Sequence, residues 1–273
     1  MRNLILIAAL SAGPAFAQPA DTELWRLDCG TIHFSDMSMF SDSFDYAGQP
    51  GLLTDSCYLI RHGGDYLLWD AGLPKDRLGA KLDDAAPTSS TLAASLTDQL
   101  AQIGVAPGQI GRVGISHNHF DHVGQAADFP TATLLIGAAD WDGLRADPPA
   151  FGVQPDLLRP WLDGGKVQPV SGDLDIFGDG SVTMLRMPGH TGGETALLVR
   201  LAETGPVLLS GDVAHFHAQI ERGNIPAFNA DRADSLASMD RMEDIATGLN
   251  AQLIVQHDPD DIGKLPAFPA SAK

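Results

Sequence analysis

The chain has 273 residues, enough for one large domain or two small ones with a sizeable buried core. Its hydrophobic (44%) and charged (19%) fractions are those of a globular protein. Beyond the N-terminus no run approaches the roughly 18 apolar residues of a membrane helix. A formal net charge of −18 at pH 7 disfavours nucleic acids and other polyanions as partners.

The first 17 residues have the pattern of a signal peptide. A positive start containing Arg2 precedes an apolar run over residues 4–10, and Ala15-Phe16-Ala17 is the small-x-small pattern that signal peptidase cleaves. We expect cleavage near Ala17, a single domain over residues 18–273, and export to the periplasm or the medium. Cleavage would remove Arg2 and change the net charge from −18 to −19. The alternative is a frayed hydrophobic N-terminus.

Strand-like segments dominate the first half of the predicted domain. One or two strands are expected over residues 18–34, followed by a long loop over residues 35–51. Residues 57–61 and 66–69 predict a hairpin, and apolar residues at helical spacing predict a helix over residues 91–103. Residues 113–116 predict a short buried strand.

The second half repeats this mixture of strands and helices. Residues 133–136 predict a strand and 138–144 a helix, while residues 147–180 are rich in Pro, Gly and Asp. Strands are expected at 182–187, 195–200, 206–210 and 253–256, and a helix at 236–249. Because no linker separates the halves, this order favours one layered α/β domain.

The two cysteines, Cys29 and Cys57, leave two interpretations open. In an exported protein they can form a disulfide. Each also lies at the edge of an apolar segment, where a small buried thiol would fit equally well.

The strongest chemical signal is the run Ser116-His117-Asn118-His119-Phe120-Asp121-His122, directly after a predicted strand. Imidazole and carboxylate are the ligands that zinc and similar divalent metals prefer. A loop leaving a strand end can direct His117 and His119 to one metal, and Asp121 and His122 to a second. The alternative is a surface histidine cluster. We expect His33 and His62 not to be ligands.

His-x-His-x-Asp-His resembles the hallmark of the metallo-β-lactamase superfold, and further motifs resemble that family in the same order over residues 24–258. They are Trp69-Asp70-Ala71-Gly72, Pro188-Gly189-His190-Thr191-Gly192-Gly193, Ser210-Gly211-Asp212 and Val255-Gln256-His257-Asp258. The resemblance implies an α/β fold of four layers, an αββα sandwich. Such motifs specify the fold and the metal site more closely than the substrate.

The resemblance also implies a site for two divalent metals. His117, His119 and His190 would hold the first metal, and Asp121, His122 and His257 the second. Asp212 would bridge both, and Asp70 would orient a ligand histidine from behind. Zinc is the expected metal, with cobalt, manganese and iron left open because similar ligands suit all of them.

Four further features are similar to the N-acyl homoserine lactone lactonases: Cys57-Tyr58-Leu59-Ile60, Asp212, Phe228-Asn229-Ala230-Asp231 and His257-Asp258. This resemblance implies lactone opening and quorum quenching. A bridging hydroxide would open the lactone ring, and Asp121 would pass a proton to the leaving alkoxide. The chain departs from this group at His215, where a tyrosine is usual. His215 would either stabilise the oxyanion or be a loop histidine without a role.

Several expectations concern partners and alternatives. The loop that holds Met37, Met39, Phe40, Phe44 and Tyr46 would bind an acyl chain or simply pack. The partner is a small lactone or ester, and a homodimer is left open. The alternatives are an exported metallo-esterase or organophosphate hydrolase of the same fold, and a metal-binding module without turnover.

Overall fold

Twelve strands and six α-helices make up the part of the chain described by this computed structural model, residues 21–273. The predicted signal peptide lies outside these residues. One group of strands comprises β1 (Thr22–Phe34), β2 (Gly51–His62), β3 (Asp65–Trp69), β4 (Thr88–Thr91), β5 (Ile110–Gly114), β6 (Thr133–Gly137) and β7 (Val167–Val170). A second group comprises β8 (Leu174–Asp175), β9 (Val182–Arg186), β10 (Thr195–Leu201), β11 (Gly205–Leu209) and β12 (Gln252–Ile254). The helices are α1 (Leu96–Gln102), α2 (Phe120–Val123), α3 (Ala138–Gly143), α4 (Arg159–Leu162), α5 (His217–Arg222) and α6 (Arg232–Leu249).

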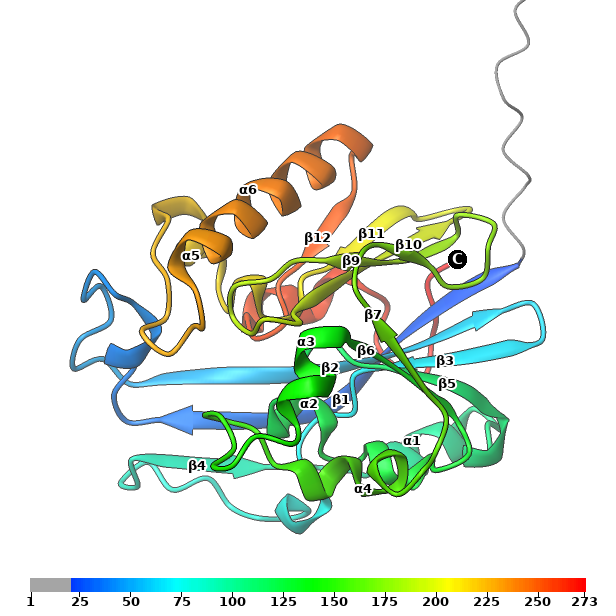
Figure 1. Ribbon diagram of the computed structural model, residues 1–273, viewed down its shortest axis with the longest axis horizontal. Helices are drawn as coiled ribbons and strands as arrows, with labels where there is room; N and C mark the ends of the chain where they lie inside the picture. The colour runs from blue at the N-terminus through cyan, green and yellow to red at the C-terminus, as the bar shows by residue number, and fades with distance from the viewer. Residues whose placement is uncertain (1–20) are drawn as a thin grey trace, which may run out of the picture.

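The strands form two sheets that lie face to face, with helices on the outer face of each (Figure 1). The seven-stranded sheet has the order β4-β1-β2-β3-β5-β6-β7, and the five-stranded sheet has the order β12-β11-β10-β9-β8. Strands β3, β5, β6 and β7 run parallel, so their carboxyl ends meet at one edge of the sheet. That edge carries the Asp70 turn after β3 and the run 117–122 after β5.

Three buried layers of apolar side chains hold the four layers together. Between the sheets, Tyr58 and Trp69 pack with Met184 and Leu197 of the opposite sheet. Outside the seven-stranded sheet, residues of α1 and α4 pack against β1, β2, β5 and β6. Outside the five-stranded sheet, α6 packs through residues that include Met239. The αββα sandwich implied by the resemblance is therefore confirmed.

Two predicted boundaries differ most from the structure, and α6 also begins at Arg232, before its predicted start at residue 236. The helix expected over residues 91–103 begins only at Leu96, because the Ser95 side chain accepts a hydrogen bond from the Asp98 backbone and caps the helix there. Residues 88–91 instead pair with β1 as a strand. Strand β2 begins at Gly51, six residues before the predicted start, because its first residues pair with the far half of β1. Helix α5 was not predicted.

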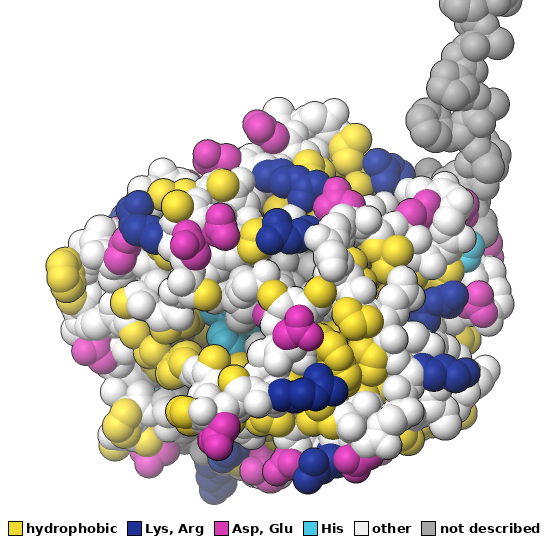
Figure 2. All heavy atoms as spheres, viewed as in Figure 1, with side chains coloured by type: hydrophobic (Ala, Val, Ile, Leu, Met, Phe, Trp, Pro, Cys, Tyr) yellow, Lys and Arg dark blue, Asp and Glu magenta, His cyan; other side chains and the backbone are white. Residues whose placement is uncertain are grey.

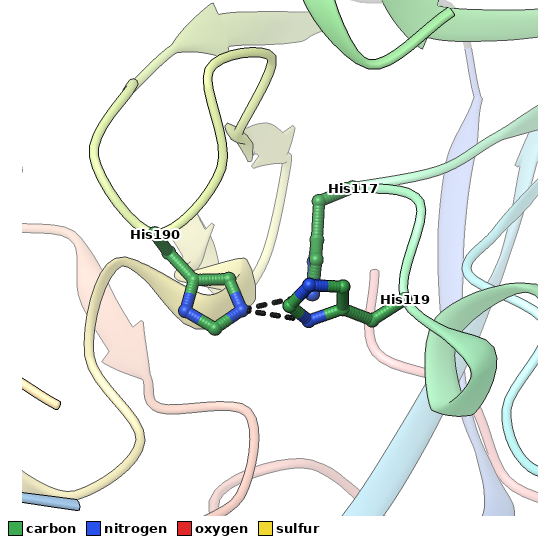
Figure 3. Close-up of side chains that lie close together, drawn as sticks. All are labelled: His117, His119 and His190. Atoms are coloured by element: carbon green, nitrogen blue, oxygen red, sulfur yellow. Dashed lines mark hydrogen bonds between the residues drawn. The ribbon is translucent and has the colours of Figure 1, made fainter. Parts of the chain in front are cut away.

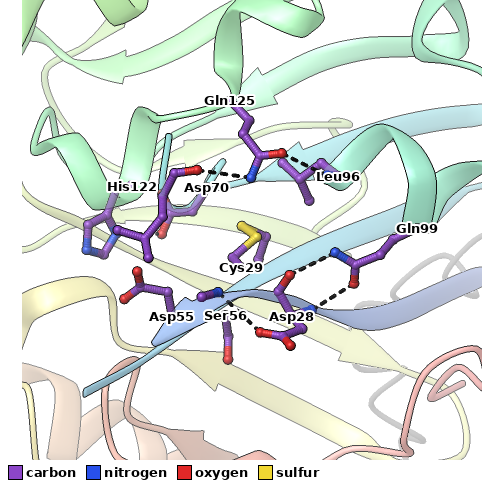
Figure 4. Close-up of a disulfide and its surroundings, with 12 residues drawn as sticks. Asp28, Cys29, Asp55, Ser56, Asp70, Leu96, Gln99, His122 and Gln125 are labelled. Carbon is purple, nitrogen blue, oxygen red and sulfur yellow. Dashed lines mark hydrogen bonds and ion pairs between the residues drawn. A yellow bond between two sulfur atoms is a disulfide. The ribbon is translucent and has the colours of Figure 1, made fainter. Parts of the chain in front are cut away.

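Cys29 and Cys57 form a disulfide between the neighbouring strands β1 and β2, which resolves the two interpretations of these cysteines (Figure 4). Its Cys29 half packs against Gly72, where an added Cβ would lie 2.4 Å from the Cys29 Cβ. The disulfide thereby supports the turn that follows Asp70. No helix within residues 21–273 is long and apolar enough to cross a membrane.

Candidate metal centre

The seven predicted metal ligands converge although they come from four separate parts of the sequence. The run 117–122 follows β5, and His190 lies in the turn after β9. Asp212 lies in the short 3-10 helix η6 (Gly211–Val213) after β11, and His257 follows β12. Each ligand thus stands just beyond the end of a buried strand, where the sheet holds its backbone in place.

The first group consists of His117, His119 and His190 (Figure 3). The Nε2 atom of His190 lies 3.1 Å from His117 Nε2 and 3.0 Å from His119 Nδ1. All three side chains are buried. Three imidazole nitrogens that face one point are arranged as ligands of a single metal ion.

The second group consists of Asp121, His122 and His257. The Nε2 atoms of His122 and His257 are 3.3 Å apart. A carboxylate oxygen of Asp121 lies within 4.8 Å of a ligand nitrogen of each imidazole. The two imidazoles are buried, and the carboxylate is partly exposed. This mixed nitrogen and oxygen set also suits a divalent metal.

Asp212 lies between the two groups, with one oxygen turned to each. Its Oδ2 atom is 3.4 Å from His190 Nε2 and 3.7 Å from His117 Nε2. Its Oδ1 atom is 3.0 Å from His257 Nε2 and 3.4 Å from His122 Nε2. This is the placement expected of a bridging carboxylate.

The side chains present fit two divalent cations. Asp212 is buried, and no donor meets its Oδ1 atom with hydrogen-bond geometry. A buried carboxylate is costly unless it is paired or coordinates a metal. The convergent imidazole nitrogens and this oxygen supply what a metal ion at each group requires. The roles of the individual ligands stay predictions.

Four side chains support the ligand imidazoles from behind. Asp70 Oδ2 lies 3.1 Å from His122 Nδ1, and Asp55 Oδ1 lies 3.0 Å from His257 Nδ1. Glu194 Oε2 lies 3.2 Å from His117 Nδ1, and Asn229 Oδ1 lies 2.9 Å from His190 Nδ1. Hydrogen bonds such as those of Asp70 and Asn229 fix the orientation and tautomer of metal-binding histidines. Asp55 and Glu194 Oε2 lie near their rings without hydrogen-bond geometry, and the Thr54 carbonyl oxygen lies 3.1 Å from His257 Nδ1.

Only Asp70 of these four was predicted. Asp55 lies in the buried stretch of β2 between Thr54 and Ser56, and this short polar run gave no sign in the sequence that its carboxylate is buried. Glu194, which immediately precedes β10, and Asn229, in a loop, carry no local signal either. Their partners are remote in sequence, so only the fold brings them together.

The electrostatic environment differs between the two groups. Burial lowers the pKa of His117, His119 and His190, to about 4 for His119, so these rings are neutral.

In the second group, burial acts in the same direction on the imidazoles, but nearby carboxylates outweigh it. Asp212 and Asp70 raise the pKa of His122 well above its usual value, and Asp212 and Asp55 do the same for His257. Burial raises the pKa of Asp121 to about 6.

Comparison with known proteins agrees with this geometry. The family model of the metallo-beta-lactamase superfamily matches residues 50–251. The chain belongs to this superfamily. It is 30% identical to the N-acyl homoserine lactonase AttM of Rhizobium johnstonii over 213 residues, which are 74% of this chain and 81% of that protein. It is also 30% identical to AttM of Rhizobium radiobacter over 225 residues, 77% of this chain and 85% of that protein.

Among solved structures, a similar fold occurs in an N-acyl homoserine lactone hydrolase with the product N-hexanoyl-L-homoserine bound at its catalytic metal centre. The TM-score is 0.79 at 19% identity, covering 92% of this chain and 99% of that one. At this identity the likeness concerns the fold alone.

In this member of the superfamily, the metal centre opens onto an apolar pocket. Figure 2 shows histidine at the base of a hollow surrounded by hydrophobic side chains. The protein atoms around the pocket belong to both ligand groups and to a set of apolar residues. The apolar set is Ile32, Phe34, Met39, Phe40, Leu53, Phe120, Phe151 and Phe228.

Of the five residues proposed to contact the acyl chain of the substrate, only some line the pocket over the metal centre. Met39 and Phe40 line the pocket over the metal centre. Met37 and Tyr46 line a neighbouring pocket instead. Phe44 is 78% exposed and lines neither.

His215 lies over the bridging carboxylate, on the pocket side. Its Nε2 atom is 3.2 Å from Asp212 Oδ2, and its ring is stacked on that of His257 at 5.4 Å between centroids. It is 2% exposed, so it is not the exposed loop histidine of the alternative interpretation. His33 and His62 lie outside the groups that could hold a metal among the described residues.

Proposed function

We propose that the protein opens the lactone ring of N-acyl homoserine lactones and thereby quenches quorum signals. The protein is a metal-dependent hydrolase of its superfamily, and relatives at 30% identity are named as lactonases of this kind. The observation that carries the proposal for this chain is the two-metal ligand set that opens onto an apolar pocket.

The walls of the pocket favour a neutral, apolar substrate. Phe40, Phe228 and six further apolar residues surround the ligands, and neither Lys nor Arg is among the lining residues. An anionic substrate, such as a phosphodiester, would meet no compensating charge there. An uncharged lactone with an acyl chain would bury apolar surface against these side chains.

The proposed ring opening uses the two metals, His215 and Asp121. Divalent metals held by the two groups would activate a water molecule and polarise the lactone carbonyl. His215 faces the pocket, where a ring N–H can donate a hydrogen bond to the carbonyl oxygen as negative charge develops on it. Water would add to the carbonyl carbon and give up a proton to Asp121, the ring C–O bond would break, and Asp121 would return that proton to the leaving alkoxide. The product is the open-chain N-acyl homoserine.

A second candidate is the cleavage of other esters or of organophosphates by the same centre. The observation that favours it is His215, which stands where the lactonases usually carry tyrosine. A module that binds metal without turnover is disfavoured, because all seven ligands are in place around the two groups.

Zinc is the proposed metal at both groups, since imidazole and carboxylate ligands of this kind suit it well. Cobalt, manganese and iron share these ligand preferences, and metal analysis of the purified protein would distinguish them.

We also propose that the protein acts in the periplasm or outside the cell. The Cys29–Cys57 disulfide supports this location, because disulfides persist in oxidising compartments. Cell fractionation and the mass of the mature protein would test it. Uncleaved protein that still begins at Met1 and is found in the cytoplasmic fraction would contradict it.

The decisive experiment compares three substrates with the purified, metal-loaded mature protein. A long-chain N-acyl homoserine lactone, a phosphotriester and a simple aryl ester are assayed side by side, with ring opening followed by proton release. We expect lactone turnover well above the other two. Strong ester or phosphotriester cleavage without lactone turnover would transfer the function to the second candidate.

The variants His215→Tyr and His215→Phe extend this experiment. Tyrosine restores a donor and should retain lactone opening, whereas phenylalanine removes the donor and should lower kcat with a smaller effect on KM. Equal activity of both variants would remove His215 from the scheme.

A further inference from the structure

The hydroxyl of Ser116 lies between the two metal-ligand groups and contacts imidazoles of both. Its Oγ atom is 3.1 Å from His117 Nδ1, which belongs to the first group, and 3.1 Å from His122 Nδ1, which belongs to the second. The same oxygen donates a hydrogen bond to Asp70 Oδ2 at 3.0 Å. Ser116 is fully buried, so water does not compete for these contacts.

The backbone around this hydroxyl is held on both sides. The Ser116 N–H donates to Asp70 Oδ1 at 2.7 Å, and the Ser116 carbonyl accepts from the backbone N–H of Thr195 at 2.9 Å. Gly211 packs so closely that an added Cβ would lie 2.8 Å from the Ser116 Cβ. The side chain therefore has little freedom to move away from either imidazole.

Counting donors and acceptors identifies one arrangement of protons that would suit two bound metals. A serine hydroxyl has one hydrogen and two lone pairs, and its hydrogen points to the Asp70 carboxylate. Both lone pairs can then accept an N–H, one from His117 Nδ1 and one from His122 Nδ1. In the neutral form that binds a metal, each ring then has an unprotonated Nε2, the atom that faces the metal position in its group.

We propose that Ser116 is a positioning residue that couples the two metal sites, so that one bound metal makes binding of the other easier. A metal at the second group fixes the His122 ring, its Nδ1–H and the Ser116 hydroxyl. The remaining lone pair then holds His117 in the tautomer that the first group needs. Coupling of this kind is reciprocal. The inference rests on the two-metal centre of the proposed function, but not on the lactone substrate.

His122 and His117 each have a carboxylate partner besides Ser116. Loss of the Ser116 hydroxyl can therefore weaken the coupling between the sites without removing all support from either imidazole. His122 keeps Asp70 at 3.1 Å, and His117 keeps Glu194 at 3.2 Å, when the hydroxyl is absent. Asp70 and His122 lie together beside the disulfide (Figure 4). Removal of the hydroxyl should therefore leave two sites that still bind metal and are still linked through Asp212, but with weaker coupling between them.

The test is a zinc titration of metal-free mature protein followed by native mass spectrometry. With one equivalent of Zn²⁺, the wild type should contain mainly metal-free and two-metal species. In Ser116→Ala the fraction of the one-metal species should rise clearly above that of the wild type, because the ratio of the second to the first stepwise binding constant falls at least about fivefold. A control is Ser95→Ala, which removes a buried hydroxyl that contacts no metal ligand; it should titrate as the wild type does.

Glu194→Gln distinguishes weaker binding from lost coupling. It changes the other partner of His117 and leaves Ser116 in place, so it should bind zinc less tightly but still in one cooperative step. A wild type that fills its sites independently would overturn the proposal. So would Ser116→Ala that titrates as the wild type does, or that binds no zinc while circular dichroism shows it folded. Because no substrate is involved, a failed lactone assay would leave this result unaffected.

Discussion

The two ligand groups of the metal centre are built from similar residues but are supported differently. In the first group, the imidazole of His190 is backed by the neutral amide of Asn229, and His117 is backed by Glu194. In the second group, both imidazoles are backed by fully buried aspartates, Asp70 and Asp55. The second group also contains a carboxylate ligand of its own, Asp121.

This difference shows how one centre can present two chemically distinct sites. The three imidazoles of the first group have pKa values lowered by burial and offer neutral nitrogen ligands. Carboxylates gather around the second group and outweigh burial there. We therefore expect the second site to depend more on charge and the first more on ligand orientation.

Replacement of the residue that both groups share should have the largest effect. Asp212→Ala removes an oxygen from each site, so we expect loss of second-metal binding and a fall in kcat/KM on the order of 10³-fold or more. Metal content by mass spectrometry and lactone ring opening would measure both. Asp84→Ala is a control, since that side chain is 90% exposed. Full activity with two metals retained would refute the bridging role.

The disulfide should matter next most, and mainly for the second group. Its sequence separation of 28 residues corresponds to about 3–4 kcal/mol in the free energy of unfolding by the chain-entropy relation. The variant Cys29→Ser/Cys57→Ser should lose about this much in urea denaturation. Because Cys29 packs on the turn after Asp70, zinc affinity should fall more at the second site than at the first. Equal losses at both sites would show that the disulfide does not support one group selectively.

Short-range patterns explain how much of this centre could be predicted. His117, His119, Asp121 and His122 lie within six residues, and motifs around strand ends marked the others. The layered fold followed from the same motifs. Partners such as Glu194 could not be found, because His117 is 77 residues away and only the packing of two sheets brings them together. The late start of α1 depended on a single cap, Ser95, within a run whose apolar spacing began earlier.

Parallel substitutions of the backing carboxylates would sharpen the comparison. Asp70→Asn should weaken zinc binding at the second site, and Glu194→Gln at the first, each by about 10- to 100-fold. If charge matters more at the second group, the Asp70 variant should show the larger loss. Competition with a chromophoric chelator would give both affinities. A larger loss in the Glu194 variant would reverse this ranking of the two sites.

The smallest expected effect tests the neutral support of the first group. Asn229→Ala removes the acceptor 2.9 Å from His190 Nδ1, and loss of one such hydrogen bond, about 1 kcal/mol, should weaken first-site zinc binding roughly fivefold. Asn229→Asp keeps the acceptor and adds charge, making this support resemble Asp55 behind His257.

If charge is what distinguishes the groups, Asn229→Asp should bind zinc at the first site more tightly than the wild type does. Ser235 accepts from the Asn229 amide at 3.0 Å and donates its own hydrogen to the Asp231 carbonyl at 2.6 Å, so it would have to give up the second bond to meet the new carboxylate. Chelator competition would compare all three proteins. If the aspartate variant binds no more tightly than the wild type, position and not charge sets the affinity of the first site.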